Sequence, residues 1–361
     1  MDRIVKIGII GCGGIANGKH MPALSKIPNV RLLAFCDIVE ERANAALDKF
    51  GAEGARVYTD YRELLADPEI EVVHVLTPNR EHADITIDAL HAGKHVMCEK
   101  PMAKTAADAR RMLEAARETG KKLTIGYQHR HKAEARFAKE YIESGAVGEI
   151  YYANCLATRR RGTPNWGVFL NEEEQGGGPV IDIATHSLDL TLYLMNNYEP
   201  EMVVGQTHKR IEHPEAGNPW GDKGVSETPL EEAACAMIRM KNGATIMLET
   251  SWALNISDPV QEGSCVLCGT REGIDLKNNV LRINKIELGR QSDVRVNTAA
   301  GGVAFYEGAS SAAPDVEAAS WIRAIVEDRD PVVLPEQALV VSEILEAIYE
   351  SSKTGKPVYF A

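Results

Sequence analysis

The sequence predicts an α/β protein with two domains: an N-terminal doubly wound parallel sheet and a C-terminal α+β domain with a largely antiparallel open sheet. Two features of the pattern predict this architecture. Short buried strands alternate with amphipathic helices in the first third of the chain, and later strands follow one another with few helices between them. The length of 361 residues also suits two domains better than one core.

The N-terminal domain is predicted over residues 1–128, where apolar runs of strand length are separated by segments with helical periodicity. Strands joined in this way pair in parallel through right-handed crossovers. The predicted strands are Ile4–Ile10, Val30–Cys36, Val72–Leu76, Lys94–Cys98 and Lys122–Ile125, and the predicted helices are Glu40–Phe50, Glu81–His91 and Thr105–Thr119.

The C-terminal domain is predicted over residues 129–334, because consecutive strands without helices between them form antiparallel sheets. Residues 212–228 are rich in Gly, Pro and charge, which is typical of a surface loop. A last helix, 335–354, begins at a proline and stops before Gly355, and we expect it to pack back on the first domain. The other predicted elements are strands at 149–160, Met202–Thr207, Ala233–Met240, Ala244–Trp252, Val260–Cys268 and Val280–Ile286, and helices at Pro179–Leu194 and Asp315–Glu327.

Composition narrows the class of partner. A net charge of −12 repels phosphate backbones, so nucleic acid is not expected as a partner. No apolar run is long enough to cross a membrane, and the first residues do not resemble a secretory signal. Seven scattered cysteines suit a reducing compartment, so we expect a cytoplasmic protein. Cys265 and Cys268 form a CxxC inside a predicted strand, and no second pair exists to complete a zinc site.

A glycine-rich segment, Gly11-Cys12-Gly13-Gly14-Ile15-Ala16, closes the first strand and opens a helix. This is the context of the dinucleotide-binding fingerprint of Rossmann domains. Gly11 permits the tight turn, Gly13 lets the backbone approach a pyrophosphate, and Ala16 is a small residue where helix packs on strand. We therefore predict Gly11, Gly13, Gly14 and Ile15 as cofactor-binding residues. A glycine run alone is weak evidence, since many tight turns contain several glycines.

Asp37 strengthens this interpretation because it ends the second strand. A carboxylate there accepts hydrogen bonds from the adenosine ribose and repels the extra phosphate of NADP, so the prediction is NAD. The alternative for Asp37 is an ordinary helix-capping residue. Thr77, Pro78 and Asn79 follow another strand and should meet the cofactor at the same sheet edge, although a plain turn favours the same residues.

Three further residues are of types that carry acid–base chemistry. Lys100 follows a predicted strand directly, and Asp182 and His186 are four residues apart on one helix. A carboxylate beside an imidazole favours its protonated form, which is the better proton donor. The alternatives are a solvated surface lysine, a helix cap and a satisfied core histidine.

These residues together resemble the glucose–fructose oxidoreductase/inositol dehydrogenase/MocA family. The resemblance spans nearly the whole chain and depends on the fingerprint, Glu99-Lys100-Pro101, Gly126-Tyr127-Gln128, Gly145–Ile150, Asp182…His186…Asp189 and the segment from Ala347 to Pro357. It implies that Lys100, Asp182 and His186 are catalytic and that the Lys100–Pro101 bond is commonly cis. It also implies that His82, Glu99, Lys100 and Gln128 contact the cofactor.

The resemblance implies a hydride transfer between NAD and a carbinol carbon of a sugar, sugar derivative or inositol. Lys100 and His186 would surround the reacting hydroxyl and Asp182 would orient them, with the formal base left open. Candidate residues for binding this small polyhydroxylated substrate are Lys100, His129, Arg159, Trp166, Asp182 and His186. Two alternatives are an NAD-dependent glycoside hydrolase and a non-catalytic dinucleotide sensor. Asp182, His186 and Asp189 could also form a metal site, but the nucleotide chemistry explains these residues without a metal, and no metal is predicted.

Apolar residues alternate in strands of the second domain, such as Ile246, Leu248 and Trp252 in Ala244–Trp252. One face of the sheet should pack on the helices of the domain. Apolar residues on the other face would leave an exposed patch larger than a monomer normally tolerates. We therefore predict a homodimer or homotetramer that assembles through the second domain.

Overall fold

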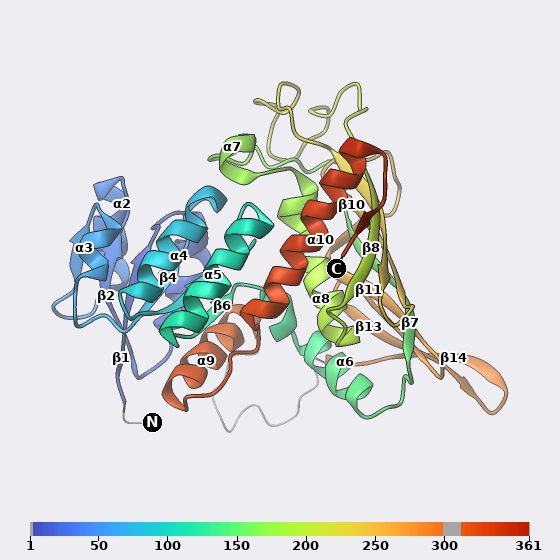
Figure 1. Ribbon diagram of the computed structural model, residues 1–361, viewed down its shortest axis with the longest axis horizontal. Coiled ribbons are helices and arrows are strands. Elements are labelled where there is room, and N and C mark those ends of the chain that lie inside the picture. The colour runs from blue at the N-terminus through green and yellow to red at the C-terminus, as the bar shows by residue number, and fades with distance from the viewer. Residues whose placement is uncertain (1–2, 299–311, 361) are drawn as a thin grey trace. The chain divides into compact units, whose positions relative to one another are not determined.

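The computed structural model describes residues 3–298 and 312–360, which form two compact units (Figure 1). The first unit contains Met1–His131 and Ser310–Leu339, and the second contains Lys132–Ala309 and Val340–Ala361. Helix α10 (Pro335–Thr354) therefore begins in one unit and continues in the other.

The first unit is built on a six-stranded sheet in the order β3-β2-β1-β4-β5-β6, in which every pair is parallel. The order reverses between β1 and β4, the place where doubly wound sheets bind their ligands. The doubly wound sheet predicted from the sequence is confirmed. Its strands are β1 (Val5–Ile10), β2 (Val30–Cys36), β3 (Arg56–Tyr58), β4 (Val72–Val75), β5 (His95–Cys98) and β6 (Leu123–Ile125).

Helices cover both faces of this sheet, as expected for strands that are buried throughout. Residues of α2 and α9 share a core with Ile7 and Ile9 of β1 on one face. On the other face Leu64 of α3 packs against Gly8, and α4 contacts both α3 and α5 (Figure 1). The helices are η1 (Ala16–His20), α1 (Met21–Leu24), α2 (Glu40–Phe50), α3 (Tyr61–Leu65), η2 (Asn79–Glu81), α4 (His82–His91), α5 (Ala106–Thr119), η3 (Gln128–His131) and α9 (Ala313–Val326).

The second unit is built on a nine-stranded open sheet in the order β14-β13-β12-β11-β7-β10-β9-β8-β15. Only β7 and β10 pair in parallel, so the prediction of a largely antiparallel sheet is confirmed for the described residues. Its strands are β7 (Ile150–Thr158), β8 (Pro200–His208), β9 (Ala233–Met240), β10 (Thr245–Ser251), β11 (Val260–Gly269), β12 (Gly273–Lys277), β13 (Val280–Glu287), β14 (Arg290–Arg295) and β15 (Val358–Tyr359).

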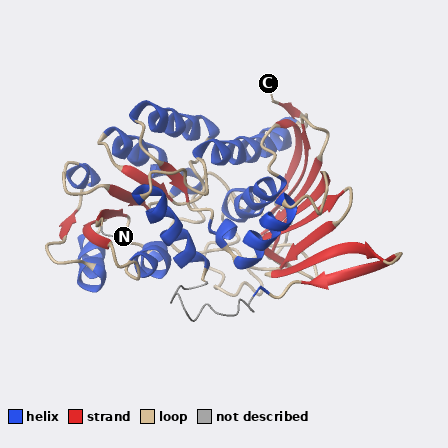
Figure 2. Ribbon diagram, turned by 90° about the horizontal axis from the view of Figure 1, so that it is seen from below, coloured by secondary structure: helices blue, strands red, loops and turns tan. Residues whose placement is uncertain are grey.

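Helices of the second unit lie on one face of its sheet, and Figure 2 shows none of the described helices on the other face. In β10 the alternation is clear, because Ile246 and Leu248 are buried whereas Met247 and Glu249 are exposed. The helices of this unit are α6 (Ala133–Glu143), α7 (Glu172–Gln175), η4 (Val180–Ala184), α8 (Thr185–Met195) and α10 from Val340 onward.

We expected helix α10 to pack back on the first domain, and its first residues, Pro335–Leu339, belong to the first unit. From Val340 onward it belongs to the second unit, where Ile348 packs against Gly205 of β8. The Ser351 hydroxyl also accepts a hydrogen bond of 3.0 Å from the Gly205 amide. Gly205 leaves room for this close approach, which a helix periodicity in the sequence does not reveal.

Several elements were not predicted, namely β3, β12, β14, β15, α3, α6 and α7. Strand β14 shows why, because most of its residues are exposed and two of them are arginines. It forms through hairpin pairing with β13 rather than through an apolar pattern of its own. The segment 212–228 contains no helix or strand, and Cys265 and Cys268 lie in β11, as predicted.

Candidate active site and cofactor-binding loop

The glycine-rich loop joins β1 to a helix that includes the π-helical turn η1. Gly11 has φ +92°, and a Cβ atom there would lie 2.7 Å from the Leu76 carbonyl oxygen. Only glycine fits this position. A Cβ atom at Gly13 or Gly14 would meet no atom within 4 Å, so the loop leaves open space where a pyrophosphate would approach. This open space beside Gly13 and Gly14 is compatible with a bound dinucleotide.

The Asp37 side chain is hydrogen-bonded to this loop. Its Oδ2 accepts a 2.9 Å hydrogen bond from the Cys12 amide, and its Oδ1 accepts one of the same length from the Val39 amide. Asp37 is not the N-cap of α2, which is Val39 and has no side-chain cap. One oxygen of Asp37 instead stabilises the turn before this helix, and the other stabilises the glycine-rich loop. Burial, together with the Asp37 charge, raises the pKa of the Cys12 thiol to about 12, so this cysteine stays neutral.

Thr77, Pro78 and Asn79 follow β4 and lead into α4, as predicted. His82 at the start of α4 is buried, and its Nε2 lies 2.9 Å from the Thr77 carbonyl oxygen. Its Nδ1 lies 2.8 Å from the Pro101 carbonyl oxygen. Both ring nitrogens therefore face backbone carbonyls, which indicates that His82 supports two loops at this edge of the sheet.

Lys100 follows β5, and the Lys100–Pro101 peptide bond is cis. The preceding Glu99 is buried, and its Oε1 accepts hydrogen bonds from Lys19 Nζ at 2.6 Å and from His20 Nε2 at 2.7 Å. Burial would raise the pKa of Glu99, but the Lys19 charge and the His20 contact lower it well below the usual range. Glu99 is thus an ionised buried carboxylate.

The partners of Glu99 were not identified from the sequence. Lys19 and His20 lie on η1, which follows the fingerprint, and Lys19 also pairs with Glu317 of α9 at 2.9 Å. His20 Nδ1 lies 3.1 Å from His74 Nδ1 on β4. The available signal was weak: the polar residues Lys19 and His20 directly precede the apolar run that contains Met21, Ala23 and Leu24.

Gln128 and His129 begin η3, which is separated from β6 by Gly126 and Tyr127. Gln128 is half-buried and His129 is buried. The next residue, Arg130, is fully buried, and its guanidinium donates to the Val332 carbonyl at 3.0 Å and to Gln337 Oε1 at 2.6 Å. This arginine anchors the segment to the C-terminal part of the same unit.

Asp182 and His186 lie in the second unit, on the continuous helical segment formed by η4 and α8. The sequence predicted this helix but not its π-helical start, and π-turns occur frequently at functional sites. Asp182 is half-buried, and its Oδ2 accepts a 2.9 Å hydrogen bond from the Trp252 indole. His186 is buried and Asp189 is fully buried. Lys100 belongs to the first unit.

Glu231 holds the start of this helix and was also missed. Its carboxylate accepts hydrogen bonds from the Gly178 amide at 3.0 Å and the Val180 amide at 3.2 Å. A Cβ atom at Gly178 would lie 2.5 Å from the Glu231 carbonyl oxygen, and one at Gly177 would overlap the Tyr349 hydroxyl. These close approaches explain Gly177 and Gly178, which the sequence showed only as a glycine run before a helix.

Arg159 and Trp166, the remaining substrate candidates, lie on a loop after β7 in the second unit. The Arg159 guanidinium lies 5.5 Å from the ring centre of Trp220 and donates to the Gly162 carbonyl at 3.0 Å. Trp166 is 48% exposed and its ring centre lies 4.9 Å from that of Trp220. The structure thus gathers an arginine and two exposed indoles on one surface.

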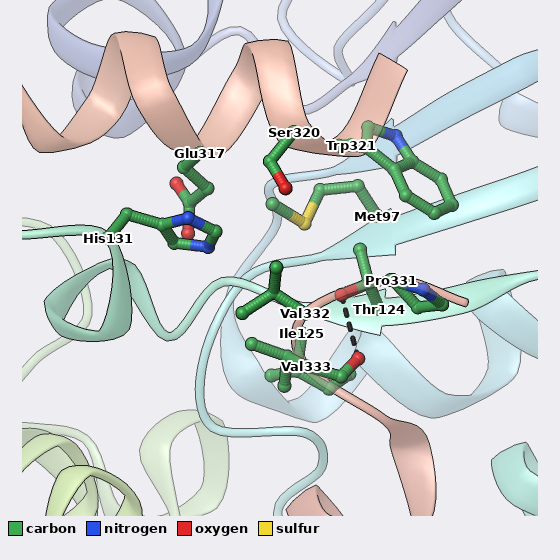
Figure 3. A pocket seen from close by; sticks show the side chains of 10 residues that line it. All are labelled: Met97, Thr124, Ile125, His131, Glu317, Ser320, Trp321, Pro331, Val332 and Val333. Atoms are coloured by element: carbon green, nitrogen blue, oxygen red, sulfur yellow. Dashed lines mark hydrogen bonds between the residues drawn. The ribbon is translucent and has the colours of Figure 1, made fainter. Parts of the chain in front are cut away.

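A small cavity of about 10 Å³ lies inside the first unit (Figure 3). Such a volume has room for roughly one water molecule, so this cavity is not a site for a sugar or a nucleotide. The Thr124 hydroxyl donates to the Val333 carbonyl at its border. Its lining consists of Met97, Thr124, Ile125, His131, Glu317, Ser320, Trp321, Pro331, Val332 and Val333.

Across residues 3–298 and 312–360, no group of three or more His, Cys, Asp or Glu side chains is arranged to hold a metal ion. Among the helices of the described chain, none has both the length and the apolar character needed to cross a membrane.

Two sequence models of one family match the chain. The model described as "Oxidoreductase family, NAD-binding Rossmann fold" matches residues 5–127, and the one described as "Oxidoreductase family, C-terminal alpha/beta domain" matches residues 139–360. The chain belongs to this family, GFO/IDH/MocA. The resemblance inferred from motifs is confirmed, and so are the predictions of an NAD-dependent oxidoreductase and of NAD as its cofactor.

The relatives that match this chain within the GFO/IDH/MocA family are named for sugars and inositols. D-glucoside 3-dehydrogenase of Escherichia coli is 36% identical over 272 residues, which cover 75% of this chain and 77% of that protein. Inositol 2-dehydrogenase of Salmonella paratyphi B is 41% identical over 146 residues, covering 40% of this chain and 43% of that protein. A levoglucosan dehydrogenase solved with NADH and L-sorbose is 25% identical, with a TM-score of 0.84 over 99% of each chain.

Proposed function

We propose that this oxidoreductase uses NAD to oxidise a carbinol carbon of a sugar, with a glucoside as the first candidate substrate. The observation that carries the proposal is the 36% identity with D-glucoside 3-dehydrogenase over three quarters of the chain. Other sugars and inositols remain within the proposal, because relatives named for them match as well.

The residues proposed to bind NAD are those that surround the open loop after β1. Gly11 sets the turn, while Gly13, Gly14 and Ile15 leave the backbone accessible, and the helix N-terminus offers amides to the phosphates. Asp37 is proposed to accept the ribose hydroxyls. Thr77, Pro78, Asn79, His82, Lys100 and Gln128 are proposed around the rest of the cofactor. Glu99 is proposed to act there through the main chain that leads to Lys100, since its carboxylate oxygens accept from Lys19, His20 and the Lys100 amide.

NAD supplies an acceptor for the hydride that leaves the carbinol carbon. Lys100 and His186 are proposed to handle the proton of the substrate hydroxyl, since both can exchange a proton near neutral pH in a suitable environment. Asp182 is proposed to orient this chemistry, and its bond to the Trp252 indole supports a fixed carboxylate. Binding of the remaining substrate hydroxyls is proposed for His129, Arg159 and Trp166.

Assembly through the second unit is also proposed, as a homodimer or homotetramer. Its sheet has a face without a described helix (Figure 2). Val204 is 39% exposed and Met247 is 36% exposed on neighbouring positions across β8, β9 and β10. A second sheet packed against this face would cover them. Cytoplasmic localisation stays a prediction.

A substrate screen tests the function. The purified protein is incubated with NAD or NADP and with methyl glucosides, free hexoses and inositols, and NADH absorbance is followed. We expect NADH to accumulate with at least one glucoside or free sugar. Release of the aglycone without net NADH would favour the glycoside hydrolase alternative. Absence of both signals with every class of compound would contradict the proposal.

A further inference from the structure

A buried ionic cluster in the first unit joins the cofactor loop to the segment that carries Lys100. Glu99 Oε1 accepts from Lys19 Nζ at 2.6 Å and from His20 Nε2 at 2.7 Å. Both donors lie on η1, which follows the fingerprint glycines directly. The side chains of Lys19 and Glu99 are each 8% exposed, so this ion pair is shielded from water and its geometry is strongly held.

The orientation of His20 follows from its partners. Because the Glu99 carboxylate only accepts, His20 Nε2 carries the hydrogen that it donates. His74 is neutral, since burial first and then the nearby His20 and Lys19 hold its pKa well below the usual range. The Nδ1 atoms of His20 and His74 lie 3.1 Å apart, and a hydrogen on either one completes a hydrogen bond between the two rings. The helix is thereby tied to β4 as well as to Glu99.

Lys100 is held on both sides by these contacts. Before it, Glu99 Oε2 accepts a 3.0 Å hydrogen bond from the Lys100 amide. After it, the Pro101 carbonyl lies 2.8 Å from His82 Nδ1, and His82 Nε2 faces the Thr77 carbonyl. The main chain on either side of Lys100 is therefore fixed by buried side chains that belong to the loops around the cofactor.

We propose that Glu99 is a positioning residue, which transmits the geometry of the glycine-rich loop and η1 to Lys100 through its contacts with Lys19, His20 and the Lys100 amide. Only the expected change in kcat rests on the proposed function, because that function assigns Lys100 to the substrate hydroxyl. Glu99 itself acts through Lys100 and touches neither substrate nor reacting atoms in this scheme.

A second carboxylate in this cluster, Glu317, provides a control for substitutions of Glu99. Lys19 pairs with two carboxylates, Glu99 at 2.6 Å and Glu317 at 2.9 Å, and both are almost fully buried. Only Glu99 bonds to the Lys100 amide. Glu99→Gln and Glu317→Gln each remove one carboxylate that pairs with Lys19, so loss of that ion pair affects both variants, whereas loss of the contacts with His20 and the Lys100 amide is confined to Glu99→Gln.

A second pair of variants moves the carboxylate without changing any charge. A Cβ atom at Gly126 would lie 3.0 Å from Glu99 Oε1 and 3.2 Å from Oε2, so Gly126→Ala must shift the carboxylate by a few tenths of an ångström. Gly8→Ala crowds Leu64 at 2.8 Å in the same sheet and serves as its control. This pair keeps the proposal testable if Glu99→Gln does not fold.

The first readout needs no activity. Hydrogen–deuterium exchange of the Lys100 amide is measured on the full chain without NAD or substrate. We expect Glu99→Gln and Gly126→Ala to accelerate this exchange at least about tenfold, the factor that corresponds to roughly 1.4 kcal/mol of lost protection. Glu317→Gln and Gly8→Ala should leave it unchanged at matched temperature below their melting points.

The second readout is kinetic. We expect Glu99→Gln and Gly126→Ala to lower kcat by about 10- to 100-fold, because small displacements of a reacting group are costly, while the Kd for NAD measured by titration changes less than about threefold. The controls should keep wild-type kcat. Equal kcat and equal exchange in Glu99→Gln and Glu317→Gln would overturn the proposal. A wild-type protein without any turnover would instead defeat the proposed function, and the exchange experiment would still decide this inference.

Discussion

The Tyr349 hydroxyl of α10 donates a 2.7 Å hydrogen bond to Glu231 Oε1, the carboxylate that also accepts the amides of Gly178 and Val180. A residue near the end of the chain therefore helps to hold the start of the helix that carries Asp182 and His186. Burial raises the pKa of Glu231 from its ordinary value and that of Tyr349 well above its own, so the tyrosine remains a donor at neutral pH.

Tyr349→Phe removes this hydrogen bond and should lower the free energy of unfolding by about 1–3 kcal/mol. Gly177→Ala should be at least as destabilising, because the new Cβ overlaps the Tyr349 hydroxyl. In the double variant the hydroxyl is gone, so its cost should be clearly less than the sum of the two single costs. Urea unfolding of all four proteins measures this, and strict additivity would contradict the packing described.

His95 predicts a pH dependence of stability. Burial, followed by the nearby Lys121 and Lys122, lowers its pKa from 6.5 to about 4. The folded state then binds fewer protons than the unfolded state between these values, so the free energy of unfolding should fall as pH decreases from 6.5 to about 4.

His95→Asn isolates this contribution. The Asn Oδ1 can replace Nδ1, which accepts the Lys122 amide at 3.0 Å, and the amide side chain does not titrate. Chemical denaturation at several pH values should give a smaller slope for the variant than for the wild type in that window. Identical slopes would show that His95 does not contribute as described.

How much of this structure the sequence predicts depends on the range of the interactions. Strands Val30–Cys36 and Ala233–Met240 and helix Glu40–Phe50 agree with the structure at both ends, because their periodicity is local and strong. Edge strand β14 was missed since its charged residues pair only through a hairpin.

The supporting residues of the candidate site could not be found from the sequence. The partners of Glu99 and Glu231 come from distant segments of the chain: Lys19 and His20 for Glu99, and Gly178 and Tyr349 for Glu231. From the sequence alone, a single Lys or Glu is expected to be a solvated side chain. Only the fold shows that opposite charges pair in the core.

Asp37 predicts cofactor preference. Asp37→Ser with Ile38→Arg should shift the ratio of kcat/KM for NAD over NADP toward NADP by about 10-fold or more, as charge repulsion of the extra phosphate is replaced by attraction. Ile38 is 90% exposed, so the arginine needs no repacking. Ile38→Arg alone is the control and should shift the ratio less. A wild type that prefers NADP would refute the role given to Asp37.

Lys100→Met and His186→Ala should each lower kcat by roughly 100-fold or more, the scale of lost acid–base catalysis. NAD affinity, followed by protein fluorescence, should change little in His186→Ala. Lys104→Met provides a lysine control on the same segment, four residues after Lys100. Turnover close to that of the wild type in either variant would remove that residue from the proposed mechanism.

The most direct test of the central claim is the stoichiometry of the reaction with a glucoside. A chromogenic glucoside is incubated with NAD, and NADH, oxidised sugar and free aglycone are each quantified. The account predicts NADH and an oxidised glucoside in equal amounts, with the glycosidic bond intact. Release of the aglycone without matching NADH would contradict a dehydrogenase and support transient oxidation followed by elimination.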